Sequence, residues 1–147
     1  MYSEAKPAPK ATSQLPRLLV VDDDQGILNA LRRMLRLHYQ VTIMLDAQDA
    51  LASLRSGAPY ELVLTDMMMP GLTGKQLYDE ATAARRELVD RFFFLSGGAY
   101  GSELHDFLRR FPDRCIDKPF DQATLVTKLG EVYARLGASR ASSDVTA

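Results

Sequence analysis

Residues 62–74 read LVLTDMMMPGLTG, in which an aliphatic run ends at Asp66 and a turn-forming segment follows. The run, counted from residue 60 to residue 65, is typical of a strand. Pro70 and the glycines after it break the chain, and a helical pattern then continues to about residue 86. A strand that ends in a carboxylate just before a helix is consistent with a parallel α/β sheet, because functional groups collect at the carboxyl ends of such strands.

The same alternation of strand and helix extends on both sides of this stretch. Strand patterns lie at residues 17–24, 40–44, 60–65, 91–95 and 114–117, and a helical pattern follows each. Apolar residues at helical spacing after the first strand illustrate the pattern, and Asp121 is a suitable N-cap for the last helix. The alternation predicts an α/β three-layer sandwich around a five-stranded parallel sheet, a flavodoxin-like (βα)5 fold with strand order 2-1-3-4-5.

The two ends of the chain differ from its middle. Residues 1–16 contain three prolines and few bulky apolar side chains, and residues 138–147 are similarly polar and small. Such segments cannot bury enough apolar surface to offset the entropy lost on ordering. We therefore expect a flexible N-terminal tail at 1–16, one domain at 17–137 and a flexible C-terminal tail at 138–147.

Composition narrows the function classes. The 147 residues are 46% hydrophobic and 25% charged, with 18 basic and 19 acidic residues, so the net charge is 18 − 19 = −1. No strong field favours a nucleic acid or a membrane as partner. A lone cysteine excludes an internal disulfide, and no apolar run approaches a membrane span or a secretory signal. We expect a soluble cytoplasmic domain.

Chemically distinctive residues stand where the predicted strands end: Asp22, Asp23, Asp66, Ser96 and Lys118. In a 2-1-3-4-5 sheet, the ends of the first, third, fourth and fifth strands line one crevice. Clustered carboxylates repel one another, and a hard divalent cation such as Mg²⁺ compensates them. An ammonium group and a hydroxyl suit phosphoryl oxygens, and a carboxylate can act as a nucleophile. The cluster predicts a Mg²⁺-assisted phosphoryl-acceptor site.

Each of these residues also has a structural interpretation. An acidic strand end can simply cap the following helix, and this is the role we assign to Asp24. Asp66 and the Ser96-Gly97-Gly98 segment could belong to plain turns, and Lys118 could be a surface lysine. Met67 is expected in the core. His38 and His105 lack spaced partners, so both are expected to be structural or exposed.

Four segments carry a family resemblance: LLVVDDD, LVLTDMMMPGLTG, FFFLSGG and CIDKPF, in this order. Together they resemble the receiver domain of two-component response regulators, over residues 17–137. The SGG and KPFD segments look like receivers attached to hybrid histidine kinases or their stand-alone relatives. The resemblance implies that a histidine kinase or a histidine phosphotransfer domain donates a phosphoryl group to the chain.

The resemblance also implies a role for each matching position. Asp66 would be the phosphoacceptor, and Mg²⁺ would be held by Asp22, Asp23, Asp66 and the backbone carbonyl of Met68. Lys118 would contact a phosphoryl oxygen, and a cis peptide bond would join Lys118 to Pro119. Ser96 would turn toward the phosphoryl group as a switch residue.

The chain departs from the family pattern at one switch position. Active receivers commonly carry Tyr or Phe three residues before the lysine, and here that residue is Cys115. We therefore hypothesise an altered output switch that relies on the loop after Ser96. The Gly97-Gly98 pair is consistent with a mobile helix after it, which hydrogen exchange would disprove by strong protection across residues 97–110. Met68 and Gly98 cannot orient a hydrolytic water, so no special acceleration of dephosphorylation is expected.

Other function classes compete with this interpretation. The domain is expected to be no enzyme beyond its own phosphorylation and dephosphorylation. A Mg²⁺-dependent phosphatase with an Asp nucleophile would need a second Asp at position 68, where the chain has Met. A receiver-like scaffold that is never phosphorylated is the other alternative. The residues after 137 are too few for a DNA-binding domain, so we expect output through an unidentified protein partner, by a monomer or weak homodimer.

Overall fold

A computed structural model describes residues 15–98 and 100–146, and most of the predicted N-terminal tail lies outside these ranges. Five parallel strands form one sheet: β1 (Arg17–Val21), β2 (Gln40–Met44), β3 (Leu62–Asp66), β4 (Phe92–Ser96) and β5 (Cys115–Asp117). Their order is β2-β1-β3-β4-β5. The predicted fold class and strand order are confirmed.

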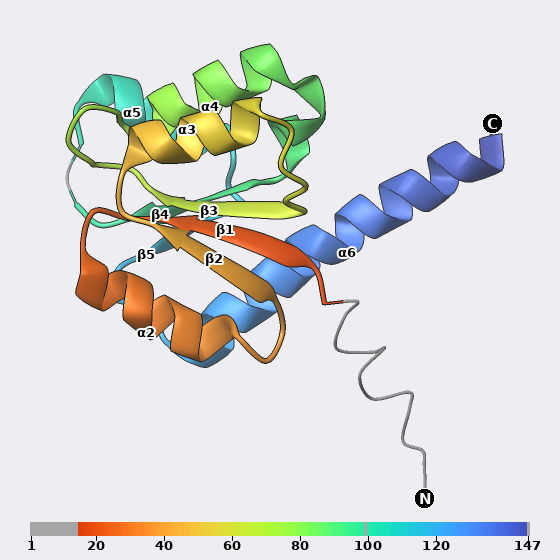
Figure 1. The fold of residues 1–147 in the computed structure, drawn as a ribbon, viewed down its shortest axis with the longest axis horizontal. Helices are drawn as coiled ribbons and strands as arrows, with labels where there is room; N and C mark the ends of the chain where they lie inside the picture. The colour runs from red at the N-terminus through yellow and green to blue at the C-terminus, as the bar shows by residue number, and fades with distance from the viewer. Residues whose placement is uncertain (1–14, 99, 147) are drawn as a thin grey trace, which may run out of the picture.

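Helices cover both faces of the sheet (Figure 1). They are α2 (Gln25–Leu35), α3 (Ala47–Arg55), α4 (Gly74–Ala84), α5 (Ser102–Arg109) and α6 (Gln122–Thr146), with a short 3₁₀ helix η1 (Arg86–Asp90). Side chains of α3, α4 and α5 pack on one face, and those of α2 and α6 pack on the other. The result is the predicted three-layer sandwich.

The inner strands β1, β3 and β4 are mostly apolar because both faces of the sheet are buried there. In β1, Leu19 and Val21 enter the core beneath α3 and α4, whereas Leu18 and Val20 enter the core beneath α2 and α6. Successive side chains of a strand point to opposite faces, so a strand covered twice needs apolar residues at every position.

An aromatic cluster joins three elements on the α4–α5 face. The ring of Tyr78 on α4 lies 5.2 Å from Phe92 and 5.5 Å from Phe107, in edge-on geometry. Phe94 lies 5.2 Å from Phe107, and Phe111 contacts the same rings. These contacts attach the C-terminal half of α5 to the sheet, because Phe107 and Phe111 are both buried.

Side-chain caps explain where several helices begin. Asp24 accepts the N–H groups of Gly26 and Ile27 at the start of α2, as predicted. Thr73 and Gln76 form a reciprocal capping box at the start of α4. Asp121 accepts the N–H of Thr124 at 2.7 Å and so caps α6. Helix α5 differs, because Gly101 occupies its N-cap position and no side chain caps its start.

The last helix is longer than predicted. It runs to Thr146, so most of the predicted C-terminal tail is helical, and the change at residue 137 is not a change of secondary structure. Small and polar residues without proline permit the helix to continue after its apolar contacts with the sheet end. No helix among the described residues is both long and apolar enough to cross a membrane.

Candidate functional site

The predicted site residues meet at one edge of the sheet, where the strands end. Asp66 is the last residue of β3 and is paired in register with Leu95 of β4. Ser96 closes β4 and is paired with Asp117, which immediately precedes Lys118. Asp22 follows β1, whose Val21 pairs with Thr65. Parallel strands in this register bring these residues together from distant parts of the sequence.

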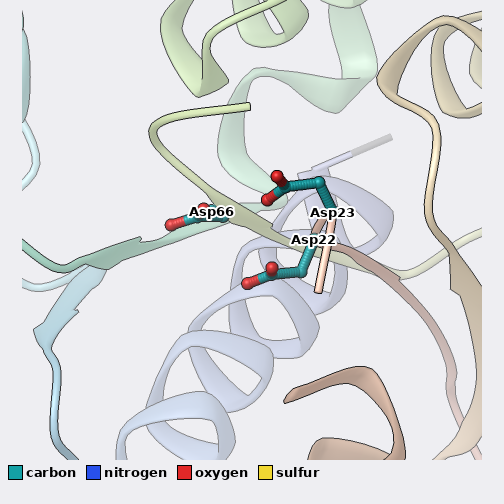
Figure 2. A group of neighbouring side chains, drawn as sticks. All are labelled: Asp22, Asp23 and Asp66. Atoms are coloured by element: carbon teal, nitrogen blue, oxygen red, sulfur yellow. The ribbon is translucent and has the colours of Figure 1, made fainter. Parts of the chain in front are cut away.

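Three carboxylates form the centre of the site (Figure 2). One ligand oxygen each of Asp22, Asp23 and Asp66 lies within 4.8 Å of the others. Asp22 is 1% exposed and Asp66 is 7% exposed, whereas Asp23 is open to solvent. The N–H of Asp24 donates to Asp22 Oδ1 at 3.0 Å and orients that carboxylate. Asp24 itself turns away to cap α2, so the acidic pair is Asp22 and Asp23.

Lys118 supplies the positive charge of the site. Its Nζ lies 3.1 Å from Asp66 Oδ1 and 3.5 Å from Asp22 Oδ2. Burial opposes the charge of this ammonium, but its bond to Asp66 and the charges of both carboxylates outweigh burial and raise the pKa of Lys118. The peptide bond between Lys118 and Pro119 is cis, as the resemblance implied.

The surroundings of Asp22 disfavour its charged form. Burial raises the pKa of Asp22, and the neighbouring charge of Asp66 raises it further, although the Asp24 amide and Lys118 favour its charged form. Burial is the main cause of this shift, and the site also holds three carboxylates against one lysine. A divalent cation would supply the missing charge.

The oxygen atoms present fit Mg²⁺. Carboxylates with room for retained water are the ligands this ion prefers. Asp22, Asp23 and Asp66 supply carboxylate oxygens. No hydrogen bond to the Met68 carbonyl oxygen is found among residues 15–98 and 100–146, and its role as a further ligand stays a prediction.

A cavity of about 350 Å³ opens beside the acidic group. Its lining residues are Asp66, Met68, Gly97, Gly98, Tyr100, Gly101, Leu104 and Lys118. Ser96 is half-buried at the end of β4 and is not among them, although its carbonyl accepts the Lys118 N–H at 2.7 Å. The cavity is large enough for a phosphoryl group bound to Asp66.

Sequence reasoning did not identify Tyr100 as part of this site. Its hydroxyl oxygen accepts the N–H of Gly97 at 2.7 Å. A tyrosine in the glycine-rich stretch SGGAYG, directly after a strand that ends in the site, was the available signal. Cys115 stands where receivers commonly carry an aromatic residue, and its side chain is half-buried. Its Sγ–H donates to the Phe111 carbonyl at 3.3 Å, and burial raises the pKa of the thiol.

The exposed fractions of two methionines and two histidines can be compared with their predicted positions. Met67 is fully buried, as predicted, whereas Met68 is 53% exposed at the cavity. His38 and His105 are both exposed, as the prediction that they are structural or exposed allows, and neither belongs to the acidic group.

A parallel sheet of this order, with an acidic cluster and a lysine at one edge, defines a class of signalling domain known as the receiver. The model of the response regulator receiver domain matches residues 18–130, and the chain belongs to this family. It is a receiver domain of two-component systems, and the resemblance stated from its motifs is confirmed.

Two relatives of the chain are named transcriptional regulatory proteins. Transcriptional regulatory protein PrrA of Mycobacterium tuberculosis is 33% identical over 143 residues, which cover 89% of this chain and 55% of PrrA. Transcriptional regulatory protein CseB of Streptomyces coelicolor is 33% identical over 131 residues, covering 82% of this chain and 50% of CseB. The chain thus spans about half the length of these relatives.

Solved structures agree with the fold. A CheY-like receiver domain protein from Methanospirillum hungatei superposes with a TM-score of 0.75 at 26% identity, covering 86% of this chain and 99% of that one. NtrX from Brucella abortus gives a TM-score of 0.76 at 27% identity, covering 90% of this chain and 30% of NtrX.

Proposed function

We propose that Asp66 accepts a phosphoryl group from a phosphorylated histidine of a kinase or phosphotransfer domain, and that the modified domain signals through altered partner binding. The observation that carries the proposal is the position of Lys118 Nζ, 3.1 Å from the Asp66 carboxylate and beside the Asp22–Asp23 pair. A nucleophile, a cation for phosphoryl oxygens and a set of oxygen ligands for Mg²⁺ thus share one edge of the sheet.

The transfer requires one bond to form and one to break. An Asp66 carboxylate oxygen attacks phosphorus, the phosphorus–nitrogen bond to the donor histidine breaks, and the imidazole leaves with a proton from solvent. Asp22, Asp23, Asp66 and the Met68 carbonyl would hold Mg²⁺, which offsets negative charge on the phosphoryl oxygens when bound. Lys118 pairs with a phosphoryl oxygen, so the chain acts by positioning and electrostatics.

The phosphoryl group also supplies the signal. Ser96, at the end of β4, would donate its hydroxyl to a phosphoryl oxygen and so report modification to the loop that follows. The surface formed by α5, β5 and α6 then shifts its population toward a state that binds a partner. On this proposal the domain catalyses only its own phosphorylation and dephosphorylation, in the cytoplasm.

We propose that the output partner is a protein. The two relatives described above are named as transcriptional regulators, whereas the near-neutral charge of this chain argues for a protein partner. No observation favours the phosphatase alternative, since Met68 stands where its second Asp is required.

Intact-mass measurement with acetyl phosphate and Mg²⁺ tests the proposal. We expect the folded chain to gain one phosphoryl group, and expect none with the Asp66→Asn variant or when EDTA removes the metal. Asp49→Asn is the matched control, because Asp49 is an exposed aspartate on α3 outside the site. If wild type stays unmodified with both acetyl phosphate and a phosphohistidine donor, the domain is a scaffold and the proposal is wrong.

A further inference from the structure

The backbone that follows β4 forms one wall of the acceptor cavity. Gly97 and Tyr100 line this cavity together with Asp66 and Lys118. A Cβ atom on Gly97 would lie only 3.0 Å from Lys118 Cδ, so the loop backbone packs directly against the lysine that faces Asp66. A phosphoryl group on Asp66 would therefore enter a space bordered by Gly97.

The Gly97 N–H is already occupied in this structure. It donates to the hydroxyl oxygen of Tyr100 at 2.7 Å, a short bond for an N–H donor. Backbone N–H groups at the wall of an anion site are donors that phosphoryl oxygens use. A charged phosphoryl oxygen is a stronger acceptor than a neutral phenol, so the two acceptors compete for one donor.

The position where receivers commonly carry an aromatic ring has none here. Cys115 occupies it, and its thiol is directed to the Phe111 carbonyl. Among the described residues that line the acceptor cavity, Tyr100 has the single aromatic side chain. It also packs against the core on the α4–α5 face.

We propose that Tyr100 is the positioning residue that couples phosphorylation to the loop and to α5. In the unphosphorylated domain, its hydroxyl holds the Gly97 N–H. A phosphoryl oxygen on Asp66 takes that N–H, and the Tyr100 side chain is released. The inference rests on the proposed function, because it assigns the regulation of the same site.

The release of Tyr100 has a direct structural route to α5. Tyr100 is followed by Gly101, which occupies the N-cap position of α5, so no side chain caps the start of this helix. The other end of α5 is held by the buried rings of Phe107 and Phe111. Movement of Tyr100 therefore shifts the start of the helix while its end stays attached.

A phosphoryl mimic measures the competition. We would titrate the full chain with beryllofluoride in the presence of Mg²⁺ and compare wild type with Tyr100→Phe. Removing the hydroxyl frees the Gly97 N–H, so we expect beryllofluoride to bind about fivefold more tightly. Tyr60→Phe is the control, because its hydroxyl bonds Ser53 at 3.1 Å, outside the cavity.

A spectroscopic readout separates this role from a general effect on stability. In chains labelled with 3-fluorotyrosine, the Tyr100 resonance is identified by its loss in Tyr100→Phe. We expect this resonance to shift on addition of Mg²⁺ and beryllofluoride, and the Gly97 amide resonance to shift in Tyr100→Phe before any addition.

The outcomes distinguish the two proposals. If wild type binds beryllofluoride and Tyr100→Phe binds equally or less tightly, or if the Tyr100 resonance does not respond, the inference is wrong and the acceptor function stands. If folded wild type neither binds beryllofluoride nor gains a phosphoryl group, the proposed function fails and the inference fails with it.

Discussion

Gly74 shows how closely the backbone packs beside Asp66, the proposed phosphoacceptor. A Cβ atom there would lie 2.7 Å from the Asp66 carbonyl oxygen and 2.9 Å from Met67 Sδ. Gly74→Ala should therefore lower the free energy of unfolding by about 1–3 kcal/mol. Urea unfolding measures this change.

Gly130 provides the matched control for this prediction. It lies within α6, and a Cβ atom there meets nothing within 4 Å. Gly130→Ala should raise the free energy of unfolding by about 0.5–1 kcal/mol, because alanine loses less backbone entropy on folding. Equal effects of the two substitutions would refute the steric argument.

Tyr39 gives the domain a defined response to alkaline pH. It is 5% exposed, and burial, with a smaller effect of Tyr133, raises its pKa to about 12. The pKa of Tyr39 in the folded chain exceeds the unfolded value of about 10. Its contribution to the free energy of unfolding is therefore fully present below about pH 10 and is lost as the pH rises through about 12. The loss amounts to roughly 2–3 kcal/mol. Tyr39→Phe should lose less stability than wild type between pH 9 and pH 11.5 in urea unfolding; parallel losses would contradict the assignment.

At the scale of elements, α4 and α5 begin in different ways. Helix α4 has a capping box, whereas α5 starts at an uncapped glycine. We expect hydrogen exchange to be about tenfold faster in the first turn of α5 than in the first turn of α4. Within α5, residues near Phe107 should be the better protected. Equal, strong protection of both first turns would show that α5 is fixed at both ends.

The elements themselves were largely predictable from the sequence. The predicted strand at 40–44 matches β2, a partly exposed strand at the sheet edge, because polar and apolar residues alternate in QVTIM. The helix expected to continue to residue 86 instead ends at Ala84, and η1 follows. The reason is tertiary: the Arg85 guanidinium donates to the carbonyls of Leu54 and Ala58, and no local pattern reveals these contacts.

At the scale of the whole molecule, the acidic cluster links metal binding to stability. Three carboxylates and one lysine leave unbalanced negative charge. Mg²⁺ at ten times its dissociation constant should stabilise the domain by about 1.4 kcal/mol. Asp23→Asn should be more stable than wild type in EDTA and gain less from Mg²⁺. Thermal unfolding with and without the ion tests this; an equal gain in both proteins would place the metal elsewhere.

The candidate site was predictable to the extent that it lies at strand ends. Parallel topology dictates that Asp22, Asp66 and Lys118 converge, whatever the loops between them do. The Tyr100 hydrogen bond was not predictable in this way. It depends on the path of a glycine-rich loop, where many backbone conformations are open and only the folded chain selects one. The part of the site that could not be predicted from the sequence is therefore the part formed by the loop after β4.

Lys118 is separated from Asp66 by 52 residues and from Asp22 by 96. During synthesis the chain emerges from its N-terminus, so both aspartates leave the ribosome well before the lysine that pairs with them. A nascent chain therefore lacks the lysine of the site until β5 has been made and has paired with β4 at the edge of the sheet. On the proposed function, the domain therefore cannot accept a phosphoryl group until synthesis has passed residue 118 and the Asp66–Lys118 pair has formed.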